Sequence, residues 1–65
     1  MKILVNGAWR ETRSAELARA LEELGFGATV VSTAVNGEFI AAAERVHTLL
    51  IDGDRLEVLA PMQGG

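Results

Sequence analysis

Few side chains of this protein could do acid–base, nucleophilic or metal chemistry. His47 is the only histidine, and the sequence contains no cysteine. A Ser–His–Asp arrangement or a zinc site needs several such residues, so neither can be built around His47. Asp52 and Asp54 flank Gly53, a pattern typical of a turn, because a calcium loop needs several more oxygen ligands. We therefore expect no catalytic side chain, no bound metal and no bound cofactor.

The remaining candidate is the end of the chain, which reads Pro61, Met62, Gln63, Gly64 and Gly65. Pro61 lacks a backbone N–H and so ends a strand ladder. From there the chain can extend at most about 17 Å. The two glycines fit a channel too narrow for any side chain. Composition alone favours an ordinary frayed terminus. The alternative is that the carboxylate of Gly65 is the functional group.

A C-terminal carboxylate is ionised at neutral pH and inert toward nucleophiles, so it must first be activated. The simplest activation is attack on the α-phosphate of ATP, which gives an acyl adenylate. A partner enzyme with ATP, Mg²⁺ and cationic groups would supply that step. In this hypothesis Pro61, Met62, Gln63 and Gly64 bind in a channel of the partner, and Gly65 is modified.

Length and charge limit the other possibilities. Sixty-five residues make one domain near the lower size limit for independent folding, and we divide the chain into a domain over 1–60 and a flexible tail over 61–65. A net charge of −3 with scattered basic residues argues against nucleic-acid binding. No apolar run approaches the roughly 20 residues of a membrane span, and the first residues are too few for a signal peptide. We expect a cytoplasmic protein that binds no membrane.

The first half of the chain predicts a hairpin and a helix. The run 2–6 predicts a strand that turns at Asn6-Gly7 into a second strand over 8–12. A two-residue turn sets Leu4 beside Trp9, whereas a longer loop shifts the register, so the side of Trp9 stays open. The helix is predicted to start with Ser14 as N-cap and to end at Gly25 in a left-handed conformation. Its apolar stripe is Leu17, Leu21 and Leu24.

The second half predicts further strands. The run 29–37 reads as a strand closed by Asn36-Gly37, and 38–40 pairs back on it briefly. Residues 41–50 read as an irregular or one-turn helical link, and 55–60 as the last strand, with Leu56, Val58 and Ala60 on one face. Strands around a single helix favour an α+β fold with the helix packed across one sheet face. The open face would carry Leu4 and Leu59, which we predict to be a partner docking face.

At the level of motifs the sequence resembles the ThiS family of sulfur carriers of thiamine biosynthesis. The motifs are "MKILVNG", "LEELG", "AVNGEFI" and "DGDRLEVLAPMQGG", in a chain of 65 residues. A terminal di-glycine is shared by all ubiquitin-like carriers, but its combination with the other motifs is more specific. In one place the chain departs from the pattern: many members carry a Pro-Arg pair where this chain has Ala41-Ala42.

The resemblance implies a β-grasp, ubiquitin-like fold with a mixed sheet of four to five strands. It also implies a carrier that is not itself an enzyme. A ThiF-type enzyme would adenylate Gly65, and a cysteine desulfurase or sulfur relay protein would convert it to a thiocarboxylate. The thiazole synthase ThiG would then accept the sulfur. The alternatives are a molybdopterin synthase small subunit, a ubiquitin-like protein modifier and an interaction module with a frayed end.

Overall fold

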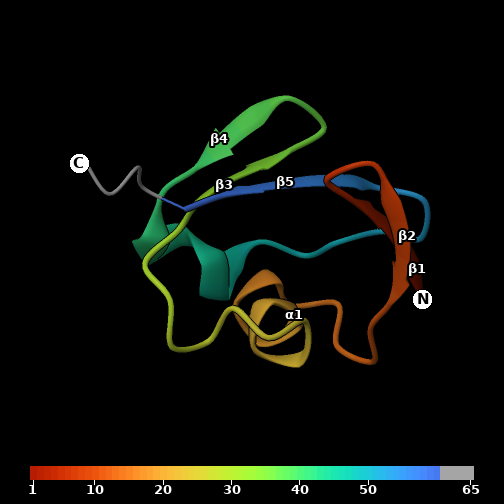
Figure 1. The fold of residues 1–65 in the computed structure, drawn as a ribbon, viewed down its shortest axis with the longest axis horizontal. Helices are drawn as coiled ribbons and strands as arrows, with labels where there is room; N and C mark the ends of the chain where they lie inside the picture. The colour runs from red at the N-terminus through yellow and green to blue at the C-terminus, as the bar shows by residue number, and fades with distance from the viewer. Residues whose placement is uncertain (61–65) are drawn as a thin grey trace.

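Five strands form one mixed sheet in the order β2-β1-β5-β3-β4, with the helix α1 on one side of it (Figure 1). The computed structural model describes residues 1–60. The last strand, β5, lies in the middle of the sheet, parallel to β1 and antiparallel to β3. The predicted α+β architecture is therefore confirmed. The elements are β1 (Lys2–Val5), β2 (Ala8–Glu11), α1 (Leu17–Glu23), β3 (Ser32–Val35), β4 (Glu38–Ile40), the 3₁₀ helix η1 (Ala42–His47) and β5 (Arg55–Leu59).

Both Asn-Gly pairs make the tight hairpin turns that the sequence predicts. Asn6 and Gly7 have φ of 49° and 85°, and Asn36 and Gly37 have φ of 51° and 84°. Two successive residues with positive φ define a turn that matches the twist of the strands it joins. The first turn fixes the register that the sequence left open, because Leu4 pairs with Trp9.

The helix begins later than predicted, so Ser14 is not its N-cap. Glu16 takes that position with extended backbone angles, and the Ser14 hydroxyl oxygen instead accepts a hydrogen bond of 3.1 Å from the Glu16 N–H. The chain is held extended there because Glu16 bridges to Leu49 and the Ala15 carbonyl accepts a bond of 2.7 Å from the Leu50 N–H. A segment paired as a strand cannot also be the first turn of a helix.

The helix ends as the sequence predicts. Gly25 has φ of 97°, and its N–H donates to the Glu22 carbonyl at 3.1 Å. The Phe26 N–H donates to the Leu21 carbonyl at 2.8 Å. This pair of bonds satisfies carbonyls that the helix leaves without partners, and a left-handed glycine makes it possible.

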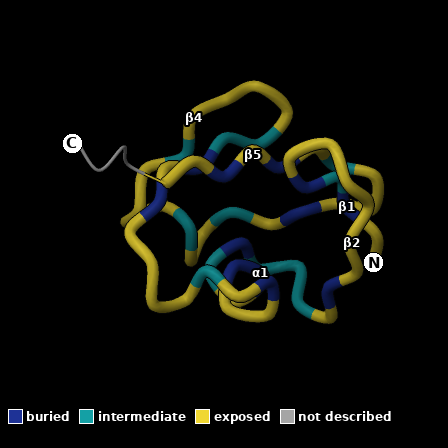
Figure 2. The backbone as a smooth tube through the Cα atoms, viewed as in Figure 1, coloured by how far each residue is buried: buried dark blue, intermediate teal, exposed yellow. Residues whose placement is uncertain are grey.

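The core lies between α1 and the sheet, as the buried segments in Figure 2 show. The predicted stripe of Leu17, Leu21 and Leu24 is buried, and so are the side chains of β1 and β5 that face it. Ala60 was predicted to share the face of Leu56 and Val58, but it is exposed and lies just beyond the end of β5. The buried apolar residues are Ile3, Val5, Leu17, Ala20, Leu21, Leu24, Val31, Leu50, Leu56 and Val58.

Candidate functional site

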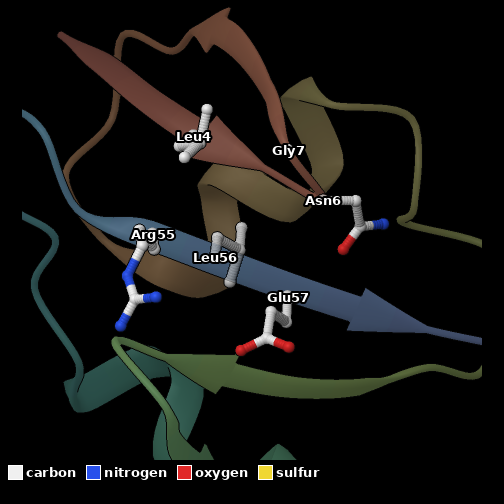
Figure 3. A pocket seen from close by; sticks show the side chains of 6 residues that line it. All are labelled: Leu4, Asn6, Gly7, Arg55, Leu56 and Glu57. Carbon is white, nitrogen blue, oxygen red and sulfur yellow. The ribbon is translucent and has the colours of Figure 1, made fainter.

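Strand β5 leads directly toward the terminal residues, and its side chains alternate between the core and the open face of the sheet. Leu56 and Val58 are buried, whereas Arg55, Glu57 and Leu59 are exposed. Figure 3 shows the side chains of Arg55 and Glu57 extending on the same side of β5. The strand therefore buries one face in the core and leaves the other exposed.

The two leucines of the predicted docking face share the open side of the sheet but do not touch as one patch. Leu4 is half-buried and pairs with Arg55, and Leu59 is 66% exposed and pairs with Ser32. Four residues of β5 separate the two levels, which corresponds to about 13 Å along the strand. Glu57 projects between them. Their docking role stays a prediction.

Two aromatic side chains also lie on this face, and neither was predicted there from the sequence. Trp9 is directly opposite Leu4 and is 59% exposed. Phe39 is directly opposite Ala34 and is 68% exposed. Directly opposed residues of antiparallel strands share a face. The Asn36-Gly37 turn could have predicted the side of the sheet on which Phe39 lies, because a two-residue turn sets Phe39 on the face opposite to Val35.

Both turn asparagines bind β5 through their side-chain amides. The Val58 N–H donates to the Asn6 Oδ1 at 2.8 Å, and the Asn6 Nδ2 donates to the Val58 carbonyl at 3.0 Å. At the other end of the strand, the Arg55 N–H donates to the Asn36 Oδ1 at 3.0 Å. The sequence predicted the turns but gave no sign of these contacts, which join residues far apart along the chain.

The aspartates near β5 have structural partners, as their spacing predicts. The Asp52 carboxylate accepts a bond of 2.6 Å from the Lys2 N–H. The Asp54 carboxylate accepts bonds from the Ile51 N–H and the Asn36 Nδ2, at 2.8 and 3.0 Å. His47 is exposed at the end of η1. Within residues 1–60 the structure contains no group of three or more side chains arranged to hold a metal ion.

The predicted tail, Pro61, Met62, Gln63, Gly64 and Gly65, lies outside the described residues. The site that the structure does describe is therefore the strand that precedes the tail, with its open face and the Asn6 contact at Val58. Across the described part of the chain, no helix has the length and apolar character that crossing a membrane requires.

Comparison with known proteins relates nearly the whole chain to one family. The model of the ThiS family matches residues 3–65, a range that includes the terminal glycines. A crystal structure of the thiamine biosynthesis protein (ThiS) from Geobacter metallireducens superposes with a TM-score of 0.81 at 30% sequence identity, and the match covers 100% of both chains. No curated protein matches the sequence. The five-stranded mixed sheet and the helix α1 of residues 1–60 correspond to the β-grasp fold of that neighbour.

Proposed function

The chain belongs to the ThiS family, and from this premise we propose that it is a sulfur carrier of thiamine biosynthesis whose working group is the Gly65 carboxylate. The single observation that carries the proposal is a family match that runs to the last residue and so includes Gly64 and Gly65. The carrier acts as a co-substrate, and the enzymes are its partners.

The chemistry starts from the free carboxylate. A carboxylate oxygen of Gly65 attacks the α-phosphate of ATP and releases pyrophosphate, which leaves an acyl adenylate. A persulfide on the sulfur donor then attacks the acyl carbon and displaces AMP, which gives an acyl disulfide. A thiol cleaves its S–S bond, so the thiol is oxidised to a disulfide and the terminus is released as a thiocarboxylate. ATP and Mg²⁺ belong to a ThiF-type activating enzyme, and the sulfur comes from a cysteine desulfurase or a relay protein. A thiazole synthase of the ThiG type accepts the sulfur, and the carboxylate is restored.

The folded domain has a separate task in this scheme, which is to be recognised. We propose that the activating enzyme docks on the open face of the sheet, on Leu4 and Leu59. The exposure of Leu59, and the exposure of Trp9 and Phe39 on the same face, supports this assignment. Exposed aromatic and leucine side chains on one face are typical of protein contact surfaces.

Intact-mass analysis tests the function in two steps. The first incubation contains the carrier, the activating enzyme, ATP and a sulfur source, with a control that lacks ATP. We expect a gain equal to one exchange of oxygen for sulfur in the complete mixture, and no gain in the control. The second step adds thiazole synthase with its sugar-phosphate and imine substrates, and we expect the carrier to return to its starting mass.

Other outcomes would identify the alternatives. A molybdopterin synthase small subunit would gain sulfur in the first step and retain it in the presence of thiazole synthase. A ubiquitin-like protein modifier would become covalently joined to other chains through an amide at Gly65. A chain that shows no change of mass in either step would be an interaction module with a frayed end. Each of these three results would overturn the assignment to thiamine biosynthesis.

A further inference from the structure

The contact between Asn6 and Val58 completes a hydrogen-bond ladder that the backbone of β1 cannot complete. In the parallel pairing of β1 with β5, the Leu4 N–H donates to the Asp54 carbonyl at 2.9 Å, and the Asn6 N–H donates to the Leu56 carbonyl at 3.0 Å. The next bonds of such a ladder would involve the N–H and the carbonyl of Val58. The backbone at Asn6 has already turned away, with φ of 49°.

The side-chain amide of Asn6 supplies the missing pair. Its Oδ1 accepts the bond from the Val58 N–H at 2.8 Å, and its Nδ2 donates to the Val58 carbonyl at 3.0 Å. A primary amide carries the same donor and acceptor as a peptide group, so it can replace one. Within residues 1–60, no other side chain hydrogen-bonds to the backbone of β5 beyond Arg55. Asn6 therefore extends the hydrogen bonding of β5 on the β1 side by two residues, from Leu56 to Val58.

We propose that Asn6 is a positioning residue for the reactive terminus, because it fixes the end of β5 from which the last residues leave the domain. The inference rests on the proposed function. Val58 is three residues before Pro61 in the sequence, so its position sets where the path to Gly65 begins. On its other side, β5 is held by β3 as far as Leu59, which pairs with Ser32. Asn6 holds the side that β3 does not reach.

The physical reason is the effective concentration of the Gly65 carboxylate at the partner's ATP site. Without the Asn6 contact the end of β5 is held from one side only, by β3, so Val58 and Leu59 separate from the sheet more often. Ordering them again costs conformational entropy. Loss of the Asn6 contact should therefore lower the rate of adenylation once the carrier is bound. Docking of the domain should be much less affected, because the open-face side chains Leu4, Trp9 and Phe39 lie on β1, β2 and β4.

The chain contains its own control for this idea. Asn36 occupies the equivalent place in the second hairpin and bonds to Arg55, at the start of β5 and far from the terminus. Glycine accepts positive φ without strain, so Asn6→Gly and Asn36→Gly both preserve the turn and remove the side chain with its amide, which for Asn36 also bonds the Asp54 carboxylate. The two variants should lose similar stability but differ in function.

The experiment measures ATP–pyrophosphate exchange with the activating enzyme at varied carrier concentration, together with the affinity of the complex without ATP by calorimetry. We expect N6G to lower kcat by about tenfold, with KM and affinity within about twofold of the wild type. N36G should match the wild type in all three quantities. Equal kcat for N6G and N36G would overturn the inference, and so would a loss of affinity as large as the loss of kcat.

Melting curves of both variants show whether they are folded at the assay temperature. If N6G is unfolded there, Asn6→Asp decides the question, because aspartate keeps an acceptor for the Val58 N–H and removes the donor to the Val58 carbonyl. A lowered kcat for N6D supports the positioning role, and a kcat equal to that of N36G overturns it. A wild-type carrier that is not adenylated at all would refute the proposed function instead, so the two failures are distinguishable.

Discussion

The carboxylate of Glu23, in the last turn of α1, accepts a hydrogen bond of 2.6 Å from the backbone N–H of Arg13, ahead of the helix. Its second oxygen accepts a bond of 2.9 Å from the Ser14 N–H. These two bonds, that from Arg13 first, lower the pKa of Glu23 below its ordinary value of 4.5. An acidic side chain is unfavourable at a helix C-terminus, where the dipole presents negative charge. The two hydrogen bonds that connect Glu23 to the loop before the helix account for an acidic side chain at this position.

Glu23→Gln should therefore destabilise the domain in a pH-dependent way. A pKa that is lower in the folded than in the unfolded state contributes stability above the unfolded value, and the contribution is lost as pH falls through the folded value. The melting temperature of E23Q should lie below that of the wild type at pH 7, and the difference should shrink below about pH 4.5. Glu22→Gln, a change to an exposed neighbour on the same turn, is the control. A pH-independent difference for E23Q would contradict this account.

Leu59→Asp should weaken binding to the activating enzyme without unfolding the domain. Substitutions at exposed sites usually change stability by less than about 0.5 kcal/mol, whereas a charge placed in a desolvated contact costs several times more. We expect a loss of affinity of about tenfold or more by calorimetry. Leu49→Asp is the matched control, because Leu49 is 71% exposed and bridges to Glu16, away from the open face. Equal losses for the two variants would remove Leu59 from the docking surface.

One alanine appended after Gly65 should abolish adenylation, because the chemistry needs the carboxylate of Gly65 itself. The addition lies outside the folded domain, so the melting temperature should not change. ATP–pyrophosphate exchange with the activating enzyme is the measurement. Undiminished exchange by the extended protein would mean that Gly65 need not be the terminal residue.

Ala41→Pro should be tolerated or mildly stabilising. Ala41 has φ of −65° and ψ of 152°, which proline adopts without strain. Successive residues of β4 alternate between those that hydrogen-bond to β3 and those that do not, starting from the bonded Val35–Glu38 pair that closes the turn. By this alternation the N–H of Ala41 points away from β3. A proline at a compatible site reduces the entropy of the unfolded chain, for a gain of about 0.4–1 kcal/mol. Denaturant unfolding measures it, and a loss of more than about 1 kcal/mol would show that the N–H has a partner.

The sequence by itself determined the elements whose rules are local. Two Asn-Gly pairs specified two hairpins, three leucines at helical spacing specified the buried face of α1, and Gly25 specified its end. Each of these features depends on residues within a few positions of one another, so nothing distant is needed to predict it. The terminal glycines are likewise a property of the chain, whatever its fold.

The tertiary structure decided what depends on residues far apart. It placed β5 between β1 and β3, and it delayed the helix to Leu17 by pairing Glu16 with Leu49. It also gave Asn6 a second role at Val58, 52 residues away. The physical reason is that a side-chain amide has the same hydrogen-bonding groups in every turn, and only the packing of the sheet determines which backbone it meets.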